Sequence, residues 1–279
     1  MTKKNDSIVT QNSTAEHNGE FVNASRIKYI SLFAGIGGFD LAFERAGMEC
    51  VGLCEIDDVA QSVLRHHFPD VPLYDDVREI GIATHEWGTV DLICGGVPCQ
   101  PISQAAARSE RDSNWLWPEM MRVINEIEPR WIIFENPEAI RFSKRGLGII
   151  LGNLTRNGYD CFWDVLSAAE FGAPHKRARL WLVANSNCNG KSKLREYAKA
   201  HQLQKSSLAN RPIWPYPPQD LRMDDGIPNR VALKLYGNSL IPQIAEWIVR
   251  TIIKVDDLNE IDGIAAAFLA EHPEANNED

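Results

Sequence analysis

Short apolar runs alternate with segments of helical periodicity through most of this chain, and that alternation limits the possible folds more than any other feature. The apolar runs predict strands at 28–33, 50–54, 90–94, 130–134 and 180–184. The spacing of apolar residues elsewhere predicts helices at 37–46, 57–68, 117–127, 146–156 and 241–253. Strand–helix–strand units build mainly parallel sheets whose two faces are covered by helices. We therefore predict a doubly wound α/β fold.

The remaining segments divide the chain into regions. Residues 1–26 are polar and lack the apolar stretch of a secretory signal, so we predict a disordered lead-in. The main domain is predicted to comprise residues 27–184 and 236–254. Residues 185–235 lose the periodic pattern and are predicted to form a small irregular region, whereas residues 255–279 are predicted to be an acidic tail.

Charge is distributed unevenly along the sequence. The formal net charge is −9, but residues 255–279 hold eight Asp or Glu and no Lys or Arg. The rest of the chain therefore has a net charge of −1. Residues 176–211 hold nine Lys or Arg against one acidic residue, Glu196. A basic segment on a nearly neutral body is typical of polyanion binding, although a solvated loop can have the same composition.

The composition argues against a membrane protein and against a zinc protein. No apolar run reaches the roughly 18–20 residues that a membrane span needs. The six cysteines form no CxxC pair and no Cys/His cluster with zinc spacing, so we expect no metal. Free thiols in a reducing compartment are the simplest interpretation for all of them except Cys99, and we expect a cytoplasmic protein.

A glycine-rich turn follows the first predicted strand. The run Phe33-Ala34-Gly35-Ile36-Gly37-Gly38 leads into the first helix, and Glu55 ends the second strand twenty residues after Gly35. Glycines let the backbone approach a ligand, and a carboxylate at that strand end can bind ribose hydroxyls. The pattern G-x-G-G differs from the G-x-G-x-x-G of a dinucleotide-binding oxidoreductase, which remains the competing interpretation. It favours a ribose-bearing cofactor without pyrophosphate, such as S-adenosylmethionine, with Asp75 or Asp76 near the adenine amino group.

Three further segments carry groups suited to chemistry on a nucleic-acid base. Cys99 follows Pro98 at the end of the third strand, where its thiolate would be a nucleophile, although a buried structural cysteine is the alternative. Glu135 ends the fourth strand and would face the same crevice, unless it caps a helix. Arg177 and Arg179 alternate before the fifth strand, so both are predicted to point to one face and bind phosphate or carbonyl oxygens.

In this order the segments resemble the cytosine-5 DNA methyltransferase family, over about residues 28–249. The matching motifs are FAGIGG, Cys54-Glu55-Ile56-Asp57, Asp75-Asp76-Val77, GGVPCQPIS, Trp115–Glu119, Glu135-Asn136, Arg177-Ala178-Arg179 and YGNSLIP at 236–242. The resemblance implies a Rossmann-like fold and a site for S-adenosyl-L-methionine formed by Phe33, Ala34, Gly35, Ile36, Gly38, Glu55, Ile56, Asp76, Val77, Pro98, Leu116, Asn238 and Ser239. It implies that the catalytic residues are Cys99, Glu135, Arg177 and Arg179.

The resemblance also implies a mechanism. Addition of the Cys99 thiolate to C6 of cytosine would make C5 nucleophilic enough to accept a methyl group. Glu135, hydrogen-bonded at N3, would stabilise the charge that develops in the ring, while Arg177 and Arg179 would steady the base carbonyl and the backbone. The base cannot be reached inside a duplex, so we expect double-stranded DNA from which the base is flipped out.

The sequence departs from the family pattern at three places. Pro137 stands where the family usually has valine, which removes a backbone N–H, restricts Asn136 to extended geometry and could shift the cytosine pocket. His175 stands where glutamine is usual. Residues 185–235 are short for a target-recognition region, as in compact phage and prophage members, and this suggests a short or relaxed target site.

Two alternatives remain open from the sequence. One is the same reaction on RNA, and the other is a catalytically silent relative that binds cofactor and DNA. We further expect a monomer in a bacterial or phage-infected cell, with a cognate restriction endonuclease as a candidate partner.

Overall fold

The computed structural model describes residues 27–81, 87–98, 115–143, 146–187, 192–207 and 239–271. For helix residues 206–207 and 258–271 it describes the backbone alone. The predictions made for residues 1–26, for Cys99 and Asn238, and for much of 185–235 therefore lie outside the described residues.

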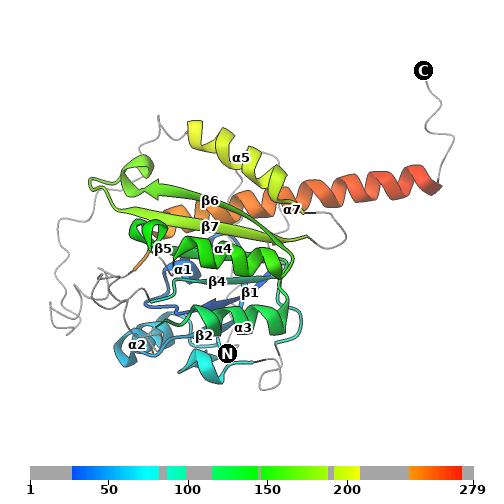
Figure 1. Ribbon diagram of the computed structural model, residues 1–279. Helices are drawn as coiled ribbons and strands as arrows, with labels where there is room; N and C mark the ends of the chain where they lie inside the picture. The colour runs from blue at the N-terminus through cyan, green and yellow to red at the C-terminus, as the bar shows by residue number, and fades with distance from the viewer. Residues whose placement is uncertain are drawn as a thin grey trace, which may run out of the picture.

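Seven strands form one sheet at the centre of the molecule (Figure 1). The strands are β1 Lys28–Leu32, β2 Glu49–Cys54, β3 Leu73–Tyr74, β4 Leu92–Gly95, β5 Trp131–Pro137, β6 Tyr159–Ser167 and β7 Ala178–Ser186. Their order in the sheet is β3-β2-β1-β4-β5-β7-β6. The pairs from β3 to β5 are parallel, whereas β7 runs antiparallel to both β5 and β6. The order reverses between β1 and β4, and sheets of this type bind ligands at such a switch point.

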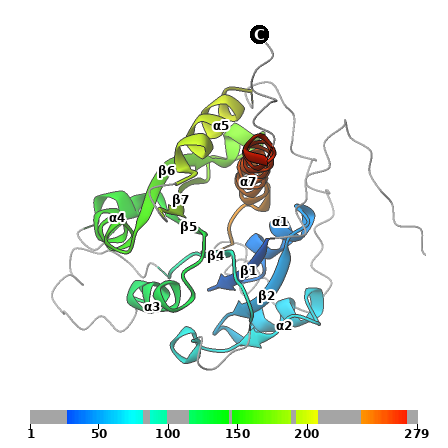
Figure 2. The same cartoon turned by 90° about the vertical axis from the view of Figure 1, so that its right-hand side faces the viewer.

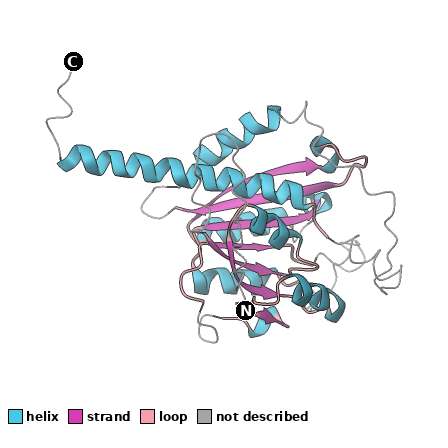
Figure 3. Cartoon of the chain, turned by 180° about the vertical axis from the view of Figure 1, so that it is seen from behind, coloured by secondary structure: helices cyan, strands magenta, loops and turns pink. Residues whose placement is uncertain are grey.

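Helices cover both faces of the sheet (Figure 2). Helices α1 (Gly38–Arg45) and α7 (Pro242–Glu271) lie on one face, and α3 (Trp117–Ile127) and α4 (Leu147–Arg156) lie on the other. The remaining elements are α2 Asp58–His67, α5 Leu194–Ser207 and the short 3-10 helices η2 Val77–Glu79, η4 Glu138–Phe142 and η5 Ala168–Phe171. Helix α7 extends well past the edge of the sheet (Figure 3).

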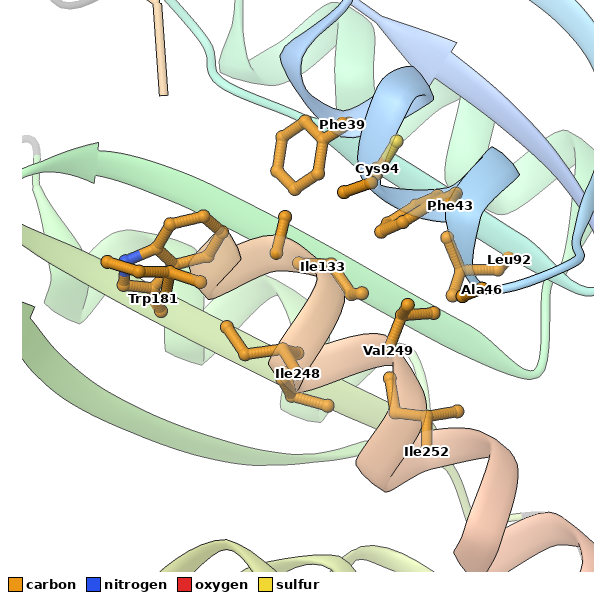
Figure 4. Packing of buried hydrophobic residues seen from close by; sticks show 14 of the residues in the cluster. Phe39, Phe43, Ala46, Leu92, Cys94, Ile133, Trp181, Ile248, Val249 and Ile252 are labelled. Atoms are coloured by element: carbon orange, nitrogen blue, oxygen red, sulfur yellow. The ribbon is translucent and has the colours of Figure 1, made fainter. Parts of the chain in front are cut away.

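Each face of the sheet has its own apolar core. Phe39 and Phe43 of α1 belong to the core that α7 completes with Ile248 (Figure 4). On the other face, the rings of Trp117 and Phe134 meet edge to face, with centroids 5.6 Å apart. Burying each such side chain stabilises the fold by about 1.5–3 kcal/mol. These cores hold the strands whose ends carry the site.

The predicted α/β fold is confirmed, but several elements differ from the sequence prediction, among them the short strand β3, which was not predicted. Strand β6 was not predicted, because Asp160 and Asp164 interrupt its apolar pattern. Helix α5 lies within the segment predicted to be irregular, and His201 is among the few residues that it buries. Helix α7 continues to Glu271, whereas the predicted helix ended at residue 253.

The acidic segment near the chain end begins inside the fold. Asp256 of α7 is 7% exposed. Its carboxylate accepts hydrogen bonds from Trp131 Nε1 at 3.2 Å and Lys193 Nζ at 2.8 Å, and it pairs with Arg130 at 3.2 Å. These contacts attach α7 to the start of β5 and to the segment before α5. This part of the predicted tail is therefore a structural anchor.

Within the described ranges, no helix combines the length and the apolar composition needed to cross a membrane.

Candidate active site

The predicted site residues gather at one edge of the sheet. Because β1 to β5 are parallel, their carboxyl ends share that edge, and the antiparallel β7 begins there. The register places Arg179 of β7 opposite Pro137, the last residue of β5. The glycine-rich turn follows β1, Glu55 follows β2, and Glu135 lies near the end of β5. Residues from distant parts of the chain therefore lie together at one edge of the sheet, at the strand ends where such sheets bind ligands.

The turn between β1 and α1 is held by the end of β2. The amide of Ala34 donates to the Cys54 carbonyl at 2.9 Å, and the amide of Gly35 donates to the Glu55 carboxylate at 2.7 Å. Phe33 and Gly35 have φ of 55° and 58°. A Cβ added at Gly35 would meet no atom within 4 Å, so the turn is open on this side. A ligand can approach the backbone there.

Gly38, in the same turn, differs from Gly35 because it faces a closely packed neighbour and not open space. A Cβ at this position would lie 2.9 Å from Leu240 Cγ and 3.3 Å from Ser239 Oγ. The segment that returns before α7 therefore packs directly against the start of α1. The structure brings together Gly38 and Ser239, two predicted cofactor residues that lie about two hundred residues apart in the sequence.

Glu55 is oriented by two backbone amides. One carboxylate oxygen accepts from Gly35, and the other accepts from Asp57 at 2.8 Å. Each oxygen keeps a further lone pair that can accept a hydrogen bond from a ribose hydroxyl. The next residue, Ile56, has 66% of its surface exposed. An exposed apolar side chain beside an oriented carboxylate suits a nucleoside.

Asp75 and Asp76 differ in their surroundings. Asp75 accepts a hydrogen bond from Gln61 Nε2 at 3.0 Å, and the same nitrogen donates to the Glu55 carbonyl at 2.6 Å. Asp76 caps η2 by accepting from the Arg78 amide at 2.9 Å and pairs with the Arg78 guanidinium at 3.0 Å. Gln61 was not predicted from the sequence, because no motif marks a side chain that reaches from α2 to two strand ends.

These groups together fit an adenosine-containing ligand such as S-adenosylmethionine. Space for a ligand lies beside Gly35. Glu55 offers an oriented carboxylate as hydrogen-bond acceptor, and Ile56 offers an exposed apolar surface. Val77 is 3% exposed and packs into the core with Leu116, so its side chain supports the site from behind.

The turn that leads to Cys99 lies against Glu135. A Cβ added at Gly96 would be 3.3 Å from Glu135 Oε2, a contact closer than is usual for a side chain. Asn136 Nδ2 donates to the Val97 carbonyl at 2.9 Å. Pro98 is exposed at the end of the described part of this turn. Cys99 itself lies outside the described residues, but the turn immediately before it is fixed to the Glu135-Asn136 segment.

Glu135 is a buried carboxyl group with a raised pKa. It is 7% exposed and pairs with Arg179 Nε at 3.1 Å, although the angles of this contact are not those of a hydrogen bond. Burial raises the pKa of Glu135 from 4.5 to about 7, and the charges of Arg179 and then Arg177 oppose that rise. Burial therefore outweighs the two arginines, and the group can exchange a proton near neutral pH. The alternative role as a helix cap does not apply, because Pro137 occupies the N-cap position of η4 and no side chain caps this helix by a hydrogen bond.

The two arginines have different partners. Arg177 Nη2 donates to the Ser239 carbonyl at 2.5 Å, whereas Arg179 Nη1 donates to the Ala178 carbonyl at 2.9 Å. Burial lowers the pKa of Arg177, and the neighbouring Arg179 charge lowers it further. Arg177 therefore connects the region at the start of β7 to the segment that returns before α7, a contact that the sequence did not predict.

Comparison with known proteins identifies the family of this chain. Residues 27–226 match the family model described as C-5 cytosine-specific DNA methylase. The chain belongs to this family. The type II methyltransferase M.DsaV of Dactylococcopsis salina is 30% identical over 182 residues, which cover 64% of this chain and 51% of that protein. The type II methyltransferase M.HhaI of Haemophilus parahaemolyticus is 32% identical over 167 residues, which cover 58% and 50%.

A solved structure of a putative DNA modification methyltransferase encoded within an E. coli prophage is 26% identical, with a TM-score of 0.50. The match covers 58% of this chain and 47% of that one. This chain thus spans about half the length of the two type II methyltransferases that it matches.

The departures from the family pattern can now be placed. Pro137 is exposed at the end of β5, with φ −53° and ψ 141°, and directly precedes η4. This φ is the value that proline prefers, so the residue is not strained. Glu135 and Arg179 are paired with Pro137 in place. His175 is exposed before β7.

Proposed function

We propose that this protein transfers a methyl group from S-adenosylmethionine to C5 of cytosine in DNA. The observation that supports this most directly is the position of Glu135, which is buried, paired with Arg179 and in contact distance of Gly96 in the turn that leads to Cys99. A carboxyl group with a pKa of about 7 beside a nucleophile turn suits proton exchange with N3 of a bound cytosine.

In the proposed reaction the Cys99 thiolate forms a bond to C6. The electron pair of the C5–C6 double bond then forms a C4–C5 double bond, and the pair of the C4–N3 double bond moves onto N3. Protonated Glu135 gives its proton to N3, which leaves C5 electron-rich without net charge on the ring. S-adenosylmethionine, when bound, supplies the methyl group that C5 accepts. Loss of the C5 proton to a base, expulsion of the Cys99 thiolate and return of the N3 proton to Glu135 restore the ring and the site.

The cofactor residues are proposed from the geometry of the strand ends. Glu55 would accept from the ribose hydroxyls, Ile56 would cover the adenine ring, and Asp76 would accept from the adenine amino group. The turn at residues 33–38, together with Ser239 of the returning segment, would enclose the rest of the molecule. The proposed roles of Pro98, Leu116, Val77 and Asn238 follow from the family resemblance.

We propose duplex DNA as the nucleic acid, because the matched relatives carry names of type II methyltransferases and of a DNA modification enzyme. Purified protein should transfer labelled methyl groups to duplex DNA more than to tRNA, and the reverse preference would contradict this choice. Recognition is assigned to the basic region 185–235. Because α5 packs into the main domain, an exchange of residues 208–235 with a relative should change the methylated sequence and leave the fold intact.

The chemistry is tested by covalent capture. DNA synthesised with 5-fluorocytosine should form a stable adduct with the wild-type protein when cofactor is present, because fluorine prevents the loss of the C5 proton. The Cys99→Ser variant should form no adduct and transfer no methyl groups, while its affinity for S-adenosylhomocysteine stays within a few-fold of wild type. A fully active serine variant would contradict the mechanism, and a wild-type protein without adduct or methylation would support the silent alternative.

We also propose that the protein acts as a cytoplasmic monomer without a metal ion, and that a cognate restriction endonuclease is a candidate partner. Among the described residues, no group of three or more His, Cys, Asp or Glu is placed to hold a metal. Methylation that survives treatment with EDTA, and a single species of monomer mass in light scattering, are the expected results.

A further inference from the structure

Arg122 of α3 makes an unusually large set of hydrogen bonds behind the proposed cofactor site. Its Nη1 donates to the Ile80 carbonyl at 2.6 Å, and its Nη2 donates to the Val77 carbonyl at 2.8 Å. Nε donates to Glu119 at 3.0 Å, and Nη1 also donates to Glu126 at 2.9 Å. One guanidinium thus holds two backbone carbonyls from a segment more than forty residues away in the sequence.

The two carbonyls belong to the turn that carries Asp76. Val77 begins η2 and Ile80 follows its last residue, while Asp76 caps the same 3-10 helix through the Arg78 amide. The amide of Glu79 donates to the Asp76 carbonyl at 3.0 Å. A shift of the carbonyls bound by Arg122 would therefore move the Asp76 side chain.

The surroundings of Arg122 keep this contact in place. The side chains of Val77 and Ile80 are 3% and 1% exposed, so the turn is packed against α3 as well as hydrogen-bonded to it. Burial lowers the pKa of Arg122, but hydrogen bonds to Glu119 and Glu126 outweigh burial and raise it overall. A Cβ at Gly81 would lie 2.6 Å from Glu126 Oε2, so the chain beyond η2 runs directly past this pair.

We propose that Arg122 is a positioning residue for the adenosine half of the cofactor, acting through the η2 turn on Asp76. The inference rests on the proposed function, because it assumes that Asp76 meets the adenine amino group. Lysine cannot replace this arginine, since a single ammonium nitrogen lacks the planar fork that reaches two carbonyls and two carboxylates.

The test measures binding of S-adenosylhomocysteine to the full chain by calorimetry, in the absence of DNA. Arg122→Lys should bind about tenfold more weakly, as expected when charged hydrogen bonds to the turn are lost. The wild type should prefer S-adenosylhomocysteine to its inosine counterpart, which offers Asp76 no amino group. The variant should lose part of that preference, whereas a purely structural role would weaken both ligands equally and would refute the proposal.

Arg130→Lys is the matched control. Arg130 also bridges two carboxylates, Asp91 and Asp256, each at 3.2 Å, but it lies at the amino end of β5, away from the site. This variant should lower the melting temperature and leave ligand affinity and base preference unchanged. Weaker ligand binding in both arginine variants would assign the effect to general loss of stability.

A measurement on the wild type covers the case in which Arg122→Lys does not fold. Saturating S-adenosylhomocysteine should slow hydrogen exchange at the amides of Arg78 and Glu79, because ligand contact with Asp76 stabilises their hydrogen bonds. Unchanged exchange at both amides, with ligand bound, would overturn the inference. A wild-type protein that does not bind the ligand would instead contradict the proposed function.

Discussion

The pKa of Glu135 predicts how the stability of the protein depends on pH. Burial raises this pKa from 4.5 to about 7. At about 1.4 kcal/mol for each pKa unit, ionising the group in the folded protein costs about 3 kcal/mol more than in the unfolded chain. The neutral form therefore stabilises the folded state. That stability is fully present below pH 4.5 and is lost as pH rises through about 7, because the unfolded chain releases the proton first.

Glu135→Gln removes the titration while keeping the size of the side chain. We expect the free energy of unfolding of the wild type, minus that of the variant, to fall by about 3 kcal/mol between pH 4 and pH 8. Urea denaturation followed by tryptophan fluorescence measures both free energies at each pH. Glu138→Gln, which removes an exposed carboxylate three residues away, controls for changes in overall charge.

If the free energies of unfolding of wild type and Glu135→Gln change in parallel with pH, the reasoning is refuted. That result would show that Glu135 has the same pKa in the folded and the unfolded protein. A wild type that gains stability relative to the variant as pH rises would refute it more strongly. That result would mean that Arg179 and Arg177 outweigh burial and hold the group as a permanent anion. The rate of adduct formation with 5-fluorocytosine DNA should also decline above pH 7, because fewer molecules then carry the proton for N3.

Three other substitutions test the packing of the same edge. Gly95→Ala should destabilise the fold by about 1–3 kcal/mol in urea denaturation, because the new Cβ would lie 2.7 Å from the Leu32 carbonyl oxygen. Asn136→Ala should cost about 1–3 kcal/mol by leaving the Val97 carbonyl without its donor, and should slow capture of 5-fluorocytosine DNA. Pro137→Val should lower stability by about 0.4–1 kcal/mol, since proline fits its φ of −53°, and should leave methyl transfer intact. A large loss of methyl transfer in this last variant would show that proline shapes the pocket.

The sequence predicted the parallel strands of the fold well. It did not predict β6 and α5, and each has a physical reason. Strands such as β1 and β4 are buried on both faces, so their apolar runs are continuous and easy to detect. Strand β6 is an edge strand with partly exposed residues, and its pattern is mixed. Helix α5 is held by a polar contact between His201 and Asp164, at 3.2 Å, which a hydrophobic pattern cannot reveal.

The candidate site was predictable where it depends on strand ends. Glu55, Glu135 and Arg179 each follow or flank an apolar run, and parallel topology then brings them to one edge. Two side chains that hold the neighbouring backbone were not predictable: Gln61 donates to the Glu55 carbonyl and Arg122 to the Val77 carbonyl, from helices that carry no motif for this purpose. Such contacts depend on the packing of α2 and α3 and exist only in the folded chain.

The state of Glu135 could not be read from the sequence either, because opposing effects decide it. Two neighbouring arginines would by themselves favour a permanent carboxylate, which could accept a hydrogen bond but could not supply a proton to N3. Burial beside Trp181, its partner across the strand pair, reverses that preference. Arg177 is also engaged with the Ser239 carbonyl. Burial and the two arginines together therefore bring the pKa of Glu135 to about 7, so that both protonation states are populated near neutral pH. Pro137, at the end of β5, does not prevent this arrangement.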